Sequence, residues 1–109
     1  MLQAMTPRIE LLWWEGCPST PRTLADLRAA LKQAGLDPAA IEVREISDPE
    51  QAQREGFPGS PTIRIDGIDP FPADDAVGLS CRIYRLDDGR VSPTPDPGRL
   101  REAIARAAS

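Results

Sequence analysis

The pattern of apolar and polar positions in the first third of the chain predicts a strand followed by a helix. Residues 8–14 are mostly apolar and end in two tryptophans, with Glu10 as the exception, which is typical of a buried central strand. After a turn, apolar side chains recur at the spacing of one helix face and end before Gly35, a natural helix stop: Leu24, Leu27, Leu31 and Ala34. We therefore expect a central strand with an amphipathic helix packed on it.

The sequence allows two starting points for this helix. Thr20 and Pro21 suit the N-cap and the first helical position. Alternatively the helix begins at Pro18, with Cys17 as the cap. Both readings place the sulfur of Cys17 within one turn of a helix N-terminus.

Further short strands and helices follow, each bounded by turn or cap residues. Alternation predicts the strands, and aspartate-proline pairs mark two helix starts. In chain order we expect an edge strand at 41–46, a short helix from Asp48 to Gly56, a strand at 62–66, a polar loop at 67–80 that Phe71 anchors, a strand at 81–86 and a helix opened by Asp96 and Pro97.

The resulting order of elements is βαβ, short helix, ββα. A βαβ unit makes the first two strands parallel, with a right-handed crossover, and the later hairpin adds an antiparallel pair. We therefore expect one α/β domain over residues 1–109, with a four-stranded mixed sheet and helices on both faces. Residues 1–7 are expected to be a flexible N-terminus, and residues 67–80 a loop insertion between the third and fourth strands.

Composition narrows the class of protein. A chain of 109 residues supports one core, and its net charge of −4 argues against a nucleic-acid partner. No segment has the length of a membrane span, and the N-terminus does not resemble a secretory signal. Twelve of the thirteen basic residues are arginines, which fits a GC-rich bacterial genome. We therefore expect a bacterial, cytoplasmic protein without a membrane partner.

The chain has two cysteines and no histidine. The lack of histidine excludes imidazole catalysis and imidazole metal ligands, so any general base is a carboxylate, a thiolate or water. Unpaired N–H groups at a helix N-terminus stabilise a thiolate, which lowers the pKa of a cysteine such as Cys17 below its free value of ~8.5. The Thr20 hydroxyl is placed to donate a further hydrogen bond to this sulfur. Cys17 and Thr20 are therefore the candidate catalytic residues.

The turn Gly16-Cys17-Pro18-Ser19-Thr20-Pro21 and the later Gly59-Ser60-Pro61-Thr62 together resemble the thioredoxin-like superfamily, across nearly the whole chain. The closest resemblance is to small bacterial single-cysteine members, some of which are labelled alkylmercury lyases. This likeness implies that Cys17 is the nucleophile and that Pro61 is a cis-proline facing it. It also implies that the backbone N–H and C=O of Ser60 hold substrate. Alternation sends one of Trp13 and Trp14 into the core and the other to the rim of the thiol, and Trp14 is the candidate for substrate binding.

The position that holds the second cysteine of a dithiol enzyme is Thr20 in this chain. Cys81 is the other candidate for a second thiol. If the fourth strand runs parallel to the first, however, Cys81 starts at the far end of the sheet, more than ~12 Å from Cys17. We therefore expect Cys81 to be a core thiol, and glutathione or another small thiol to resolve the mixed disulfide as a co-substrate.

These features predict a monothiol oxidoreductase that exchanges Cys17 with a disulfide-containing protein or a small thiol, or undergoes oxidation at that residue. No cofactor and no metal are expected for this function. A non-catalytic binding module, with a peptide held beside Pro61, is the alternative. A third reading is mercury, organomercurial or soft-metal handling through Cys17 and Cys81, which requires the two sulfurs to meet.

Overall fold

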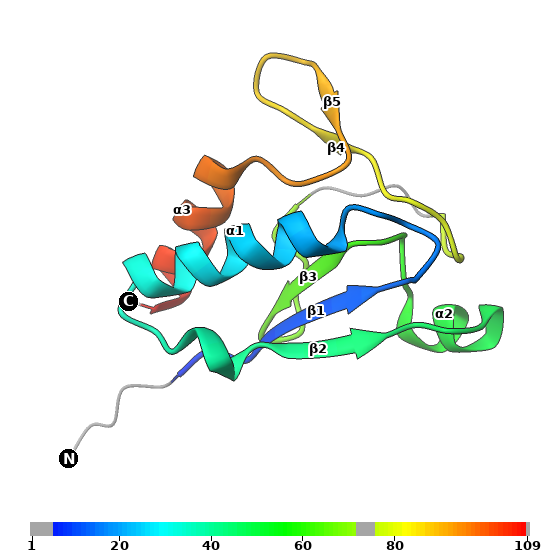
Figure 1. Cartoon of the computed structure of the whole chain (residues 1–109), viewed down its shortest axis with the longest axis horizontal. Coiled ribbons are helices and arrows are strands. Elements are labelled where there is room, and N and C mark those ends of the chain that lie inside the picture. The colour runs from blue at the N-terminus through cyan, green and yellow to red at the C-terminus, as the bar shows by residue number, and fades with distance from the viewer. Residues whose placement is uncertain (1–5, 72–75, 109) are drawn as a thin grey trace.

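A three-stranded mixed sheet with the strand order β2-β1-β3 forms the centre of the fold (Figure 1). The computed structural model describes residues 6–71 and 76–108. β1 (Ile9–Trp13) is the central strand, parallel to β2 (Glu42–Glu45) and antiparallel to β3 (Thr62–Ile65). The helices are α1 (Thr20–Gln33), a 3-10 turn η1 (Pro38–Ala40), α2 (Pro49–Glu55) and α3 (Pro97–Ala108). The α/β class, the parallel βαβ unit and the edge position of β2 are confirmed.

The bounds of the helices follow from local chemistry. α1 begins at Thr20 with Ser19 as its N-cap and Pro21 in its first turn, so the alternative start at Pro18 is wrong. The α1 segment ends near Gly35, whose φ of 76° is the left-handed conformation that glycine adopts readily. At α2, the Asp48 carboxylate accepts a hydrogen bond from the Gln51 N–H at 2.8 Å, which caps the helix as predicted.

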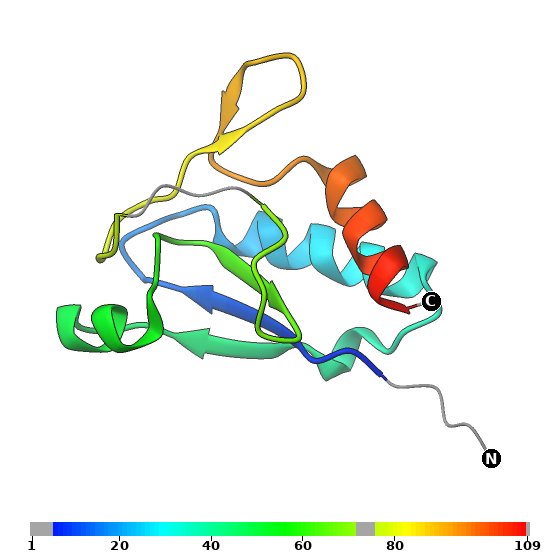
Figure 2. The same cartoon turned by 180° about the vertical axis from the view of Figure 1, so that it is seen from behind.

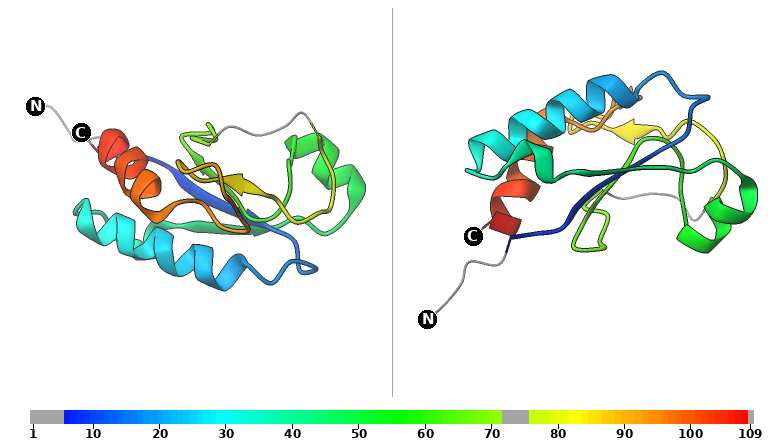
Figure 3. Two further views of the ribbon diagram at one scale, coloured as in Figure 1. Left: turned by 90° about the horizontal axis from the view of Figure 1, so that it is seen from above. Right: turned by 60° about the horizontal axis from the view of Figure 1, so that its bottom comes forward.

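Two groups of buried side chains hold helices against opposite faces of the sheet. On one face, Ile9 and Leu11 of β1 belong to a core cluster with residues of β3, α1 and α3, namely Ile63, Ile65, Leu27, Leu31, Leu100 and Ile104. On the other face, Leu12 packs with Ala52 of α2 and with Ile46 and Phe57. Helices therefore cover both faces, as the order of elements predicted. α2 and α3 lie toward opposite ends of the molecule (Figure 3).

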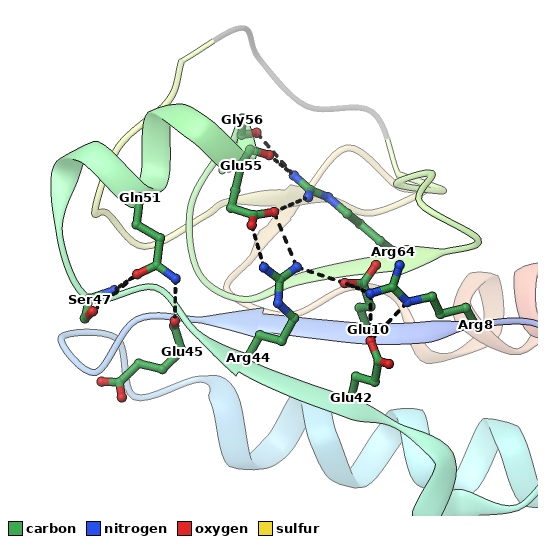
Figure 4. A network of polar contacts seen from close by, with 10 residues as sticks. All are labelled: Arg8, Glu10, Glu42, Arg44, Glu45, Ser47, Gln51, Glu55, Gly56 and Arg64. Carbon is green, nitrogen blue, oxygen red and sulfur yellow. Dashed lines mark hydrogen bonds and ion pairs between the residues drawn. The ribbon is translucent and has the colours of Figure 1, made fainter.

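Glu10, the polar exception in β1, is 3% exposed and belongs to an ion-pair network (Figure 4). Its carboxylate accepts a hydrogen bond from Arg44 at 2.9 Å and lies 3.4 Å from Arg8. Arg44 also pairs with Glu55 of α2, which Arg64 of β3 contacts as well. The buried charge is thus matched by Arg44 of the neighbouring strand β2 and by Arg8, which directly precedes β1, as burial of a carboxylate requires.

The predicted four-stranded sheet is wrong, because the chain turns back directly after β3. Asp66 and Gly67 have φ values of 51° and 80°, and Ile65 and Ile68 exchange backbone hydrogen bonds of 2.8 and 3.0 Å across them. This is a two-residue hairpin turn with both central residues at positive φ, a conformation that an Asp-Gly pair favours. The segment 67–80, of which 72–75 lie outside the described residues, therefore begins as a hairpin and not as a free loop.

The predicted strand at 81–86 is reduced to β4 (Tyr84–Arg85), which pairs with β5 (Val91–Ser92) in a separate two-stranded sheet. Seen from behind, this hairpin projects away from the central sheet (Figure 2). Phe71 anchors the preceding segment as expected. It is 9% exposed and packs edge-to-face on Tyr84, with ring centroids 5.5 Å apart.

The predicted flexible N-terminus covers residues 1–7, of which 1–5 lie outside the described residues. Pro7 is buried, and the Arg8 N–H donates to the Asp66 carboxylate at 2.8 Å. The chain is therefore fixed to the end of β3 from Pro7 onward. No helix in the described parts of the chain combines the length and apolar character needed to cross a membrane.

Candidate functional site

Cys17 lies in the turn between β1 and α1, where the sequence predicted it. Its N–H donates to the Trp14 carbonyl at 3.1 Å, which closes the turn. Cys17 is 5% exposed, but it belongs to neither of the two hydrophobic clusters. The turn lies at the same end of the sheet as the segment that carries residues 76–82 (Figures 1 and 2). Cys17 is thus a buried residue that lies outside both clusters, at the end of the sheet where β1 leads into α1.

Cys17 meets the start of β3. The Ser60–Pro61 peptide bond is cis, as the resemblance implied. The carbonyl oxygen of Ser60 accepts a hydrogen bond from the Cys17 thiol at 3.4 Å, and the Ser60 hydroxyl accepts one from the Trp14 N–H at 3.0 Å. The predicted meeting of Cys17 with Ser60 and Pro61 is therefore confirmed.

The backbone groups of Ser60 are already paired within the chain. Its N–H donates to the Ser80 carbonyl at 2.7 Å, and its carbonyl accepts from the Arg82 N–H at 2.8 Å. Ser60 and Cys81 thereby form a parallel bridge. The sequence predicted that Ser60 would offer these two groups to a substrate, and this prediction is wrong for the structure described, because residues 80–82 occupy them.

The same pairing brings the second thiol to the first. The thiol of Cys81 lies close enough to interact with the Cys17 sulfur, and both cysteines are free. Cys81 is exposed, so the predictions of a core thiol and of a separation above ~12 Å are wrong. Their physical basis was a fourth strand running parallel to the first. Cys81 instead pairs in parallel with Ser60, two residues before β3, and β3 is antiparallel to β1.

Gly59 permits this close approach. Its φ is 126°, a region that residues with a side chain rarely adopt. A Cβ at this position would lie 3.1 to 3.2 Å from the N, Cα and Cβ atoms of Arg82. The absence of a side chain at Gly59 therefore lets the backbone at 81–82 lie against the strand entrance.

The side chain of Arg82 anchors the segment that carries Cys81. Arg82 is 4% exposed, and its guanidinium donates to the Asp69 carboxylate at 2.5 Å, the Thr62 hydroxyl at 3.3 Å and the Phe71 carbonyl at 3.2 Å. It also lies over the ring of Tyr84, 4.4 Å from the centroid. The Tyr84 hydroxyl in turn donates to the carbonyl of Pro61. These contacts fix Cys81 from one side through a buried ion pair.

The surroundings make the two thiols unequal. Burial raises the pKa of Cys17, but hydrogen bonds from the Cys81 thiol and from the backbone N–H and hydroxyl of Ser19 outweigh it and lower the pKa below its ordinary value. The pKa of Cys81 is raised, because its proton is donated to Cys17 and because burial and the charge on Cys17 oppose a second negative charge. Cys17 is therefore the thiol that ionises first.

Ser19, and not Thr20, is the hydroxyl residue at the sulfur. The Ser19 hydroxyl oxygen lies 3.7 Å from the Cys17 sulfur. The Thr20 hydroxyl is buried and has no hydrogen-bond partner within the described residues. The predicted assistance from Thr20 is therefore wrong. Ser19 was overlooked, although its place at the α1 N-cap two residues after Cys17 is a signal that the sequence contains.

Trp14 borders the site but contacts its glycine neighbour most closely. Trp14 is half-buried, and its indole ring covers Gly16, where a Cβ would lie 2.3 Å from a ring carbon. The ring also packs against the cluster around Leu12. Its role at the substrate rim stays a prediction.

Other candidate sites lie away from the thiols or are absent. Within residues 6–71 and 76–108, no three acidic or cysteine side chains converge on a point that would hold a metal ion. A shallow pocket of about 380 Å³ lies between α1 and α3, among Ala30, Gln33, Ala34, Gly98, Arg101, Glu102 and Ala105. Neither cysteine lines it. Within the described residues, the pair of thiols is therefore the strongest candidate for a functional site, because two neighbouring thiols can undergo oxidation to a disulfide.

Comparisons of the chain with protein-family models, with curated proteins and with solved structures find no match. The functional argument therefore depends on the site itself.

Proposed function

We propose that this protein is a thiol–disulfide oxidoreductase whose redox centre is the pair Cys17 and Cys81. The observation that carries the proposal is the approach of the two thiols: Cys81 bridges to Ser60, whose carbonyl contacts the Cys17 sulfur at 3.4 Å, at a strand-to-helix junction. In the reaction, the two thiols lose two electrons and two protons to a disulfide of the form RSSR. An intrachain Cys17–Cys81 disulfide and two molecules of RSH are the products.

The proposal includes a thioredoxin-like arrangement of the domain. Its support is the parallel β1-α1-β2 unit, the thiol between β1 and α1, and Pro61 at the entrance of β3. The substrates on this proposal are disulfides of proteins or small molecules, and an external thiol such as glutathione returns the pair to the reduced state. The sequence predicted a single-thiol cycle, but a second thiol in contact with Cys17 makes an intrachain disulfide the simpler route.

A non-catalytic peptide-binding module is the less favoured proposal. It needs the backbone N–H and C=O of Ser60 for an incoming strand. Both groups are bonded to residues 80–82, and Cys81 lies between the two bonds. A peptide would therefore have to displace a segment that Arg82 anchors through a buried ion pair.

The test is oxidation of the reduced protein by glutathione disulfide, followed by acid quenching, thiol counting and intact mass. The wild-type protein should lose both thiols and retain no glutathione. The matched variants Cys17→Ser and Cys81→Ser cannot close the disulfide and should retain one glutathione each once they have reacted. A wild-type protein that keeps both thiols, or that ends as a stable glutathione adduct, contradicts the proposal. The second outcome would support the single-thiol cycle.

The pH dependence of alkylation provides a further measurement on the same protein. Because the pKa of Cys17 is lowered, the rate of its modification by iodoacetamide should level off at a lower pH in the folded protein than in the urea-unfolded protein. The rate for Cys81 should level off at a higher pH in the folded protein than in the unfolded one, since its pKa is raised. Peptide mapping of the alkylated protein separates the two rates.

The contact between the sulfurs also favours a second function, binding of one soft metal ion such as Hg²⁺ or Cu⁺ between two thiolates. The measurement is the stoichiometry of mercuric ion bound in the presence of a competing thiol. One ion per chain, lost in both Cys17→Ser and Cys81→Ser, would support this function. Retention of the ion by either variant would contradict a shared site.

A further inference from the structure

The two sulfurs differ in their access to solvent. Cys17 is 5% exposed, and its sulfur contacts the Ser60 carbonyl at 3.4 Å and the Ser19 hydroxyl at 3.7 Å. Cys81 is exposed, on a segment that lies over Ser60 through two backbone hydrogen bonds. Cys81 is therefore the more exposed of the two cysteines, and an external thiol or disulfide reaches it more readily than Cys17, which is covered by the residues around it.

We propose that Cys81 is the thiol that reacts with the external partner, and that Cys17 is the buried thiol that resolves the resulting mixed disulfide. This inference rests on the proposed redox function and assigns the order of its steps. It reverses the roles that the strand-to-helix position of Cys17 predicts. On this proposal, the pairing of residues 80–82 with Ser60 holds Cys81 beside Cys17 and leaves Cys81 exposed to solvent.

In the reductive direction, a partner thiolate RS⁻ attacks the Cys81 sulfur of the intrachain disulfide. The S–S bond breaks, and its electron pair leaves on Cys17. Cys81 then carries the mixed disulfide with R. A second partner thiolate attacks the sulfur of R, RSSR leaves, and the Cys81 thiolate takes a proton from water. Two electrons pass from two RS⁻ to the protein, and the opposite direction runs through the same mixed disulfide.

The groups around Cys17 suit a leaving thiolate. The Ser19 N–H and hydroxyl face its sulfur, and the thiol of Cys81, once released, donates to it as well. A sulfur whose anion is stabilised leaves faster in thiol–disulfide exchange, and the sulfur that is attacked is decided by access. The lowered pKa of Cys17 favours it as the leaving sulfur in the first reductive step, whereas the assignment of Cys81 as the attacked sulfur depends on its exposure.

The first experimental arm compares the single-thiol variants. Each is treated with glutathione disulfide, and its mixed disulfide is followed by mass. The Cys17→Ser variant, which retains Cys81, should react about tenfold faster or more than Cys81→Ser, because an exposed thiol is the accessible one. The same pair of variants in concentrated urea is the control. The two rates should then become similar, which assigns the difference to the fold.

The second arm starts from oxidised wild-type protein. A short pulse of glutathione followed by acid quenching and peptide mapping should find the transient glutathione adduct on Cys81 and none on Cys17. An adduct on Cys17, or equal rates for the two folded variants, would overturn the inference. If the wild type forms no intrachain disulfide at all, the proposed redox function fails, and the first arm still decides which thiol is accessible.

Discussion

Replacing Gly59 by alanine tests whether the close approach of the backbone at Arg82 to Gly59 is what places Cys81 beside Cys17. The new Cβ would lie 3.1 to 3.2 Å from three atoms of Arg82, two of which are backbone atoms. Arg82 cannot yield easily, because its buried side chain is bonded to Asp69 and Thr62. The φ of 126° at Gly59 adds strain that does not depend on the contact.

The magnitude follows from these two costs. A residue with a side chain held in this φ region costs about 1–3 kcal/mol, and relief of the contact by movement of residues 80–82 sacrifices two backbone hydrogen bonds of about 1 kcal/mol each. We therefore expect Gly59→Ala to lower the free energy of unfolding of the reduced protein by about 3–5 kcal/mol. We also expect the intrachain step of disulfide formation to slow by about tenfold or more, since ~1.4 kcal/mol of lost positioning is a factor of ten.

Urea unfolding and an acid-quenched oxidation time course measure the two effects. Gly89→Ala is the matched control, because Gly89 has a φ of 87° and no heavy atom within 4 Å of the position that a Cβ would take, so it bears the strain without the contact. Gly78→Ala, with neither feature, should match the wild type. The reasoning is refuted if Gly59→Ala is no less stable than Gly89→Ala and closes its disulfide at the wild-type rate.

Two further predictions concern the residues that support the site. Tyr84 is the only tyrosine of the chain and its pKa is raised by burial, so tyrosinate absorbance should appear only as the protein unfolds. Stability should fall as the pH rises above ~10, where the unfolded phenol ionises first, and a normal titration of the folded protein would contradict this. Asp69→Ala should lower the free energy of unfolding in urea by about 1.5–3 kcal/mol, because it removes a charge-assisted hydrogen bond to the buried Arg82 guanidinium. Asp88→Ala, which breaks an exposed pair, should leave stability nearly unchanged, and equal losses in the two variants would contradict the assigned role of the buried pair.

The first part of the fold was predictable because its signals are local. Ile9 and Leu11 of β1 pack on one face of the sheet and Leu12 on the other, because successive side chains of a strand point to opposite faces. Proline in the first turn and glycine after the last turn mark the ends of α1 and α2 in the sequence. The fourth strand was not predicted correctly. The Asp66-Gly67 turn was a readable signal that was overlooked, whereas the burial of Arg82 depends on distant partners that no local pattern reveals.

The candidate site divides in the same way. Cys17 lies after the end of β1, and Pro61 lies just before the start of β3. Because β1 and β3 are antiparallel, these two strand ends lie at the same end of the sheet, which brings Cys17 to the Ser60–Pro61 bond. The position of Cys81 depends on how the segment after β3 returns, which a count of residues does not determine. The hydroxyl at the sulfur belongs to Ser19 and not to Thr20, because the N-cap of α1 lies one position earlier than predicted. The Thr20 hydroxyl has no hydrogen-bond partner within the described residues.

The nearness of Cys17 and Cys81 has a consequence for the whole molecule. A bond between them would enclose α1, β2, α2 and β3 in one covalent ring. A ring of roughly 65 residues restricts the unfolded chain enough to add about 4 kcal/mol of stability. Gain or loss of two electrons would then shift the melting temperature and the resistance to proteases, so that the lifetime of this protein would record the oxidation state of its surroundings.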